Sequence, residues 1–160
     1  MPRPMTIEAH GDLEIVVVRH FDAPRDLVFD AWTRPDLLRQ WLGVHNGWTM
    51  PRCEVDLRIG GSYRYVWHGP GGEVMGVRGE FRDIVAPERI VCTEAFDESW
   101  YSGGALITNK FEETPDGTRC RLTIRYESEA ARDGVLASPM EQGMEAGFRA
   151  LDDLVADGPI

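Results

Sequence analysis

The chain has 160 residues, 42% hydrophobic and 28% charged, which is enough for one domain with its own core and without a metal or disulfide staple. A formal net charge of -10 and 17 basic residues that form no cluster exclude a phosphate-binding surface, so nucleic acid is not an expected partner. The 3 cysteines lack C-x-x-C spacing, and we expect neither a zinc site nor any other metal or cofactor.

The N-terminus, "MPRPMTIEAHGDLEIVV", has no basic region followed by a long apolar run. We therefore expect neither a secretory signal nor a membrane anchor, and no membrane partner. The odd number of cysteines agrees with a reducing compartment, so a cytoplasmic location is expected.

The first third of the chain predicts a strand followed by two short helices. Residues 13–20, "LEIVVVRH", are rich in β-branched side chains, as is typical of a strand. Pro24 then precedes an apolar-periodic stretch that reaches Trp32, and Pro35 begins a second helix, "PDLLRQWL". The segment "GVHNGWTM" is rich in Gly and Asn, so we expect a loop.

Residues 53–127 predict an antiparallel meander, because strand-like runs alternate with turn signals such as "GPGG", "APER" and "TPDG". In the last run, "TRCRLTIRYE", apolar residues alternate with arginines and a threonine. One face of the sheet is therefore expected to be covered and the other wet. The expected strands are "CEVDL", "GGSYRYVWH", "EVMGVRGEFRDIV", "IVCTEAF", a looser "DESWYSGG", "ALITNKFEE" and "TRCRLTIRYE".

A long C-terminal helix is expected over residues 138–155, "SPMEQGMEAGFRALDDLV". Ser138 and Glu141 have the spacing of a capping box, and Pro139 suits the first turn. At helical spacing the apolar residues share one face, and most of the acidic residues lie on the opposite face. The helix is the obvious cover for the dry face of the sheet.

The apolar face of this helix contains Gly143 and Gly147, although a glycine weakens a helix by about 1 kcal/mol relative to alanine. Two explanations stay open. The glycines leave volume for a cavity, or they allow the helix to approach the sheet closely.

The order of these elements resembles the SRPBCC superfamily with its START-like, helix-grip fold. Within it, the chain resembles the polyketide-cyclase-like branch related to the C-terminal domain of the heat-shock-chaperone ATPase activator. The resemblance covers about residues 13–157 and rests on "FDAPRDLVFDAWTRPDLLRQWL", "GGSYRYVWHGPGG", "GVRGEFRDIVAPERIVCTEAFD" and "MEQGMEAGFRALDDLV".

That resemblance implies an α+β fold in a single domain over residues 1–160. A curved antiparallel sheet wraps around the long C-terminal helix, and two short helices follow the first strand. A cavity between the helix and the sheet opens near the short helices.

Aromatic rings and thioethers on the glycine side of the helix and in the facing segments are the candidates for ligand binding. Each of them also suits ordinary core packing, and only the two glycines favour a cavity. The candidates are Trp41, Trp48, Tyr65, Trp67, Met140, Met144 and Phe148.

Catalytic candidates are polar residues whose pKa would shift in an apolar cavity. They lie in no recognisable motif, so the catalytic residue is left unassigned. Glu94 and Asn109 stand out because they interrupt apolar strands and need partners if buried. The candidates are His45, His68, Glu80, Glu94 and Asn109.

Three functions stay open because one fold serves many. We expect a binding module that takes up a small apolar or aromatic molecule. The first alternative is an enzyme of the cyclase or dehydratase type that uses the same cavity. The second is a chaperone-associated interaction domain, which the family name suggests and which the lack of an N-terminal chaperone-contacting domain in this sequence makes less expected. The sequence also leaves a homodimer open.

Overall fold

The computed structural model describes residues 5–98 and 103–156, and its centre is an eight-stranded sheet. All neighbouring strands are antiparallel, in the order β1-β2-β8-β7-β6-β5-β4-β3. Residues 99–102 of the run "DESWYSGG" and both ends of the expected domain lie outside the described residues. The strands are β1 (Thr6–His10), β2 (Glu14–Phe21), β3 (Thr49–Val55), β4 (Ser62–His68), β5 (Val74–Val85), β6 (Arg89–Phe96), β7 (Ala105–Thr114) and β8 (Gly117–Tyr126).

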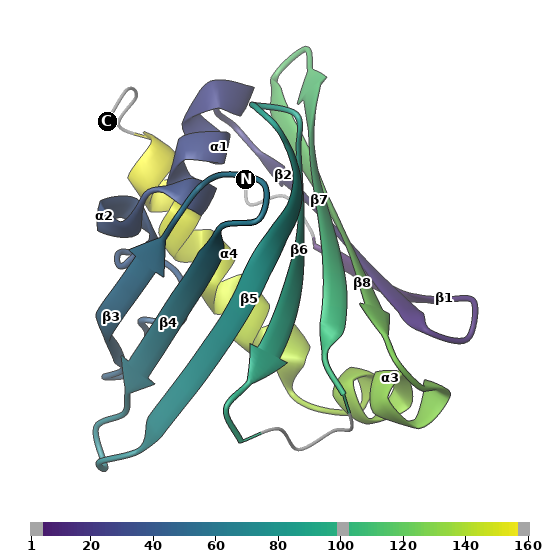
Figure 1. Ribbon diagram of the computed structural model, residues 1–160. Helices are drawn as coiled ribbons and strands as arrows, with labels where there is room; N and C mark the ends of the chain where they lie inside the picture. Colours follow the sequence, from purple (N-terminus) through teal and green to yellow (C-terminus); the bar gives the residue numbers. More distant parts are fainter. Residues whose placement is uncertain (1–4, 99–102, 157–160) are drawn as a thin grey trace.

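The sheet is strongly curved, and the long helix α4 (Met140–Ala156) crosses its concave side (Figure 1). The helices α1 (Arg25–Thr33) and α2 (Pro35–Leu38) follow β2 and lie beside the C-terminal half of α4. This arrangement confirms the expected α+β helix-grip fold, with two short helices between the first expected strand and the meander.

Alternation along β8 places one face against the interior, as the sequence predicts. Every second residue, from Cys120 to Tyr126, is buried; between them Arg121 and Arg125 are exposed and Thr123 is half-buried. The apolar face of α4 supplies the opposing cover through Gly147, Phe148, Leu151 and Val155, which are all buried.

Arg19 on β2 fixes the C-terminal half of α4 to the sheet. Its side chain is 1% exposed, and both terminal nitrogens donate to the Asp152 carboxylate, at 2.9 and 2.7 Å. A third hydrogen bond, of 3.1 Å, reaches Glu145. These charge-assisted bonds compensate the guanidinium for its loss of water and set the position of the helix.

Two elements were not expected from the sequence. Strand β1, "TIEAH", is short and mostly exposed; its two apolar residues, Ile7 and Ala9, alternate with polar ones, but only Ile7 is half-buried. Helix α3 (Glu129–Leu136) precedes α4 and is capped by Ser128, whose side chain accepts a hydrogen bond from the amide of Ala131. The Ser138 hydroxyl donates to the carbonyl of Val135, so it serves the end of α3, and α4 itself begins at Met140.

Candidate functional site

A cavity of about 830 Å³ lies between α4 and the concave face of the sheet. That volume falls within the range of about 300–1,000 Å³ that is usual for small-molecule sites. Its wall is built from alternate residues of β4, β5, β6, β7 and β8, because side chains of a strand point to opposite faces in turn. Most of these wall residues are apolar, and they include Ile90, Ile107, Leu122 and Ile124.

Three aromatic rings close one end of the cavity. The ring centroids of Trp32 and Trp41 are 4.8 Å apart, and Phe148 of α4 lies 5.9 Å from Trp32 and 6.3 Å from Trp41. The indole nitrogen of Trp41 donates to the carbonyl of Ala31 at 2.9 Å. This bond satisfies the polar edge of the ring and leaves an apolar surface towards the cavity.

The cavity reaches solvent where exposed and half-buried residues border it. Met75 at the start of β5 is 40% exposed, and Pro139 and Gly143 next to and within the first turn of α4 are exposed lining residues. The half-buried Leu42 and Gly43, in the segment after α2, also border the cavity. The opening therefore lies between that segment, β5 and the beginning of α4.

The residues expected to bind a ligand are brought together with one exception. The cavity lining includes Trp41, Tyr65, Trp67, Met140, Met144 and Phe148. Trp48 is not part of the described lining, because it precedes β3 and packs beside Gly69, in the turn after β4. The binding role of the six lining residues stays a prediction.

The two glycines of α4 have different surroundings. A Cβ added to Gly143 would meet no heavy atom within 4 Å, and Gly143 borders the cavity. A Cβ added to Gly147 would lie 3.2 Å from the carbonyl oxygen of Trp41. Open volume therefore explains Gly143, and close approach explains Gly147, although the approach is to the segment after α2 and not to the sheet.

Glu94 on β6 is the carboxylate of the described cavity wall. Burial raises its pKa to about 7, because an apolar environment disfavours the charged form. Glu94 pairs with Ala105 on β7. On its other side the β5–β6 register, in which Arg78 pairs with Ala95, places Gly79 beside Glu94. Glu94 is half-buried and borders the cavity.

Tyr63 on β4 lies close to this carboxylate. Its hydroxyl donates across β5 to the carbonyl of Thr93, a path that Gly79 permits because any side chain there would collide with the Tyr63 ring. Burial is the main cause of a raised Tyr63 pKa, and Glu94 contributes to the same shift. The phenol therefore remains protonated at neutral pH.

Asn109 on β7 is a second polar residue in the cavity wall. It is 6% exposed, and its Oδ1 atom is buried without a hydrogen-bond partner among the described residues. Its register partners are Ile90 on β6 and Leu122 on β8. An amide in such apolar surroundings needs a partner from within the cavity.

The other catalytic candidates divide between two locations. His45 lines the cavity, and its Nδ1 atom is buried without a partner among the described residues. His68 ends β4 and is exposed, and Glu80 is exposed on β5 near Arg82, at 3.6 Å. His68 and Glu80 are thus outside the described lining.

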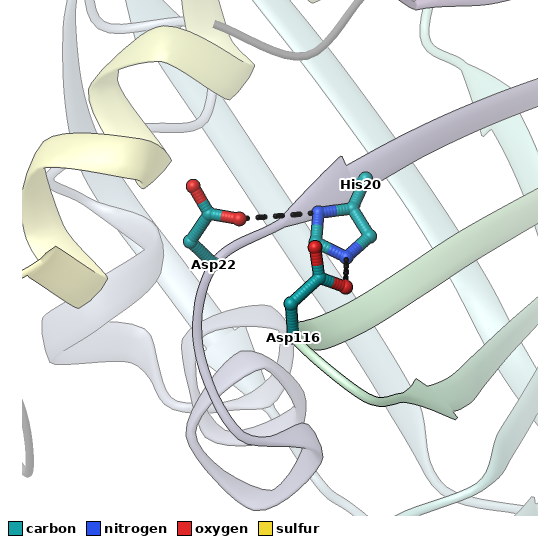
Figure 2. Close-up of side chains that lie close together, drawn as sticks. All are labelled: His20, Asp22 and Asp116. Carbon is teal, nitrogen blue, oxygen red and sulfur yellow. Dashed lines mark ion pairs between the residues drawn. The ribbon is translucent and has the colours of Figure 1, made fainter. Parts of the chain in front are cut away.

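A further group of side chains, His20, Asp22 and Asp116, lies outside the described cavity lining and was missed by sequence reasoning. Asp22 lies 3.4 Å from Nδ1 of His20, and Asp116 lies 3.2 Å from Nε2. Figure 2 shows the two carboxylates against opposite nitrogens of the ring. A metal ion binds one imidazole nitrogen, so this geometry suits an ion-paired histidine that joins β2 to the β7–β8 turn.

The chain matches the family described as "Activator of Hsp90 ATPase homolog 1-like protein" over residues 22–156. A crystal structure of a Rhodobacter sphaeroides protein is similar, with 33% identity, a TM-score of 0.90, and coverage of 96% of this chain and 98% of that chain. The structure of a Staphylococcus epidermidis protein has 27% identity and a TM-score of 0.82, and the match covers 98% of this chain and 96% of that chain.

An AHSA1-like protein from Aeromonas hydrophila has 21% identity, a TM-score of 0.72, and coverage of 92% and 98%, so it shares the fold. No curated protein matches the chain. Within residues 5–98 and 103–156, none of the helices combines the length and apolar character that crossing a bilayer requires.

Proposed function

Because the chain belongs to the family of activator of Hsp90 ATPase homolog 1-like proteins, we propose that it binds a small apolar or aromatic molecule between α4 and the sheet. The supporting observation is the apolar cavity of about 830 Å³. Protein interiors are close-packed, with few voids larger than a water molecule. A ligand of matching shape would remove this apolar wall from water and gain contacts with it.

The wall offers both fixed and adaptable contacts. Trp41 and Trp67 are held by hydrogen bonds from their indole nitrogens to main-chain carbonyls, so their rings give a preformed surface. Met140 and Met144 lie towards the opening, and unbranched thioether side chains adapt to ligands of different shape. This combination favours a flat or elongated apolar guest.

Uptake of N-phenyl-1-naphthylamine, a neutral probe that fluoresces in apolar sites, tests the proposal. We expect saturable fluorescence with the wild-type protein and a higher melting temperature. Gly143→Leu places a side chain into open volume beside the cavity and should weaken uptake about tenfold through loss of ligand volume. Gln142→Leu adds the same side chain at an exposed position of the same helix and serves as the control. No saturable uptake by the wild type would refute the proposal.

A second candidate function is acid–base catalysis of the cyclase or dehydratase type, and Glu94 supports it. A carboxylic acid with a pKa of about 7 can give and take protons at neutral pH. Exchange of the α-protons of benzoylacetone in deuterium oxide, followed by NMR, tests this function. The enzyme proposal requires faster exchange with the wild type than with Glu94→Gln, at equal binding of the probe. Equal rates in the two proteins would reject it.

A further inference from the structure

The polar groups of the cavity limit the charge of its ligand. The described lining contains no arginine and no lysine, and His45 is its one basic side chain, so a buried carboxylate or phosphate would lack a permanent counter-charge. Burial of an unpaired ion is strongly unfavourable. Glu94 would add repulsion when it is ionised. An anionic ligand is therefore a poor match for this site.

Several polar atoms of the wall already have partners in the protein. The hydroxyl of Tyr63 donates to Thr93, that of Ser138 donates to Val135, and the indole of Trp67 donates to Leu42. Oδ1 of Asn109 and Nδ1 of His45 are buried without a hydrogen-bond partner among the described residues. The half-buried carboxylate of Glu94 has desolvation and no hydrogen bond as the cause of its raised pKa. Of these groups, Glu94 and Asn109 lie on the sheet wall and can be matched by a ligand, because buried polar atoms in proteins are nearly always hydrogen-bonded.

The register fixes how far apart the two groups lie. Glu94 pairs with Ala105, and Asn109 lies four residues further along β7. At a rise of about 3.3 Å per residue, this corresponds to about 13 Å along the strand. Even spacing places both side chains on the same face, and the pair Cys92 and Ile107 lies between them. The wall thus has two polar points separated by an apolar stretch.

We propose that the ligand is an elongated, non-anionic apolar molecule with a hydrogen-bond donor near each end, one facing Asn109 and the other facing Glu94. This inference rests on the proposed binding function and adds the polarity and length of the guest. Asn109 offers a carbonyl oxygen, and a carboxylate accepts donors in its ionised form. A donor at each point would replace the water that these groups lose on burial.

A series of probes on one skeleton tests the inference. 4,4′-Dihydroxystilbene carries a donor at each end, 4-hydroxystilbene carries one, and 4,4′-dimethoxystilbene and trans-stilbene carry none. 4-Carboxystilbene carries an anion. Dissociation constants come from quenching of tryptophan fluorescence, because Trp32, Trp41 and Trp67 line the cavity. We expect each donor to tighten binding about two- to tenfold, and the anionic probe to bind more weakly than 4-hydroxystilbene.

Variants assign each donor to its partner. Asn109→Leu and Glu94→Leu should each remove the advantage of one hydroxyl while leaving the affinity for trans-stilbene unchanged or higher. Leu106→Ile alters an exposed side chain on the outer face of the same strand β7 and is the matched control, which should keep the full preference. The wild-type series tests the inference by itself if a variant does not fold.

The outcomes separate this inference from the proposed function. Equal affinities for dihydroxy-, dimethoxy- and unsubstituted stilbene would overturn the inference and leave apolar binding intact. Tighter binding of 4-carboxystilbene than of 4,4′-dihydroxystilbene would also overturn it. No binding of any probe would overturn the binding function and the inference together.

Discussion

A Cβ atom on Gly147 would lie 3.2 Å from the carbonyl oxygen of Trp41, whereas a Cβ on Gly143, one turn earlier, would meet nothing within 4 Å. The two glycines lie four residues apart on one face of the helix, but the absence of a side chain has a different role at each position. Gly147 lets α4 approach the main chain after α2, which brings Phe148 against Trp41. Gly143 keeps volume free beside the cavity.

Gly143→Ala should stabilise the protein by about 0.4–1 kcal/mol, because alanine restricts the unfolded chain and the new methyl group meets no atom. Urea denaturation measures this as a higher midpoint at an unchanged slope. A lower midpoint would show that the surroundings of Gly143 are packed, and it would remove the argument for open volume there.

Gly147→Ala should destabilise the protein by about 1 kcal/mol, the lower end of the cost of overpacking. The added methyl group presses on a main-chain carbonyl, which yields less readily than the tip of a flexible side chain. Near-ultraviolet circular dichroism should also change, since the Trp41 ring belongs to the displaced segment. Stabilisation equal to that of Gly143→Ala would contradict the close contact.

Glu94→Gln should stabilise the protein increasingly as the pH rises from 5 to 8. The folded-state pKa of Glu94 is about 7, above the ordinary value of 4.5, so the folded protein holds a proton that the unfolded chain has released. Ionisation of Glu94 therefore lowers the free energy of unfolding as the pH rises from about 5 to 8, by roughly 3 kcal/mol at most. Glutamine cannot ionise, so the variant does not lose this stability.

Denaturant melts of wild type and Glu94→Gln at pH 5 and pH 8 test the linkage. The difference between the two proteins should be small at pH 5 and large at pH 8. Glu80→Gln alters an exposed glutamate of the neighbouring strand β5 and should show no such trend. A difference that is independent of pH would place the Glu94 carboxyl in water.

Asp152→Asn should destabilise the protein by about 1–3 kcal/mol, because it weakens the two hydrogen bonds that Arg19 makes with this carboxylate and leaves a buried cation with less compensation. Asp153→Asn alters an adjacent exposed position and should change stability by less than about 0.5 kcal/mol. Thermal melts of the two variants give the comparison. Equal effects would mean that Arg19 does not anchor α4.

The sequence predicted most of the fold because the signals are local. β-Branched runs, turn dipeptides and the helical period of residues 138–155 identify β2, the meander and α4. Strand β1 was missed because "TIEAH" is short and has only two apolar residues, Ile7 and Ala9, to mark an alternation. Helix α3 was missed because its eight residues include Gly134 and only two large apolar side chains, Val135 and Leu136, so its main signal is the cap at Ser128.

The site was less predictable, since it depends on which side chains face one another across the sheet. Tyr65 and Trp67 belong to a regular strand, so their common face follows from period two. Trp48 lies in an irregular segment, where sequence gives no direction for a side chain. Glu94 and Asn109 both border the cavity, whereas Glu80 does not. This division follows from strand register and sheet curvature, which the sequence does not give.

The anchoring of α4 by Arg19 has a consequence for the motions of this helix. Asp152, Phe148 and Leu151 are tied to the sheet or the core, whereas Met140 and Gly143 border open volume. Local opening free energies follow such differences in burial and hydrogen bonding. We expect amide hydrogens of the first turn to exchange with deuterium well before those of residues 148–155. If the cavity binds a ligand as proposed, fraying of this single turn would open a path to it while the rest of the protein stays folded.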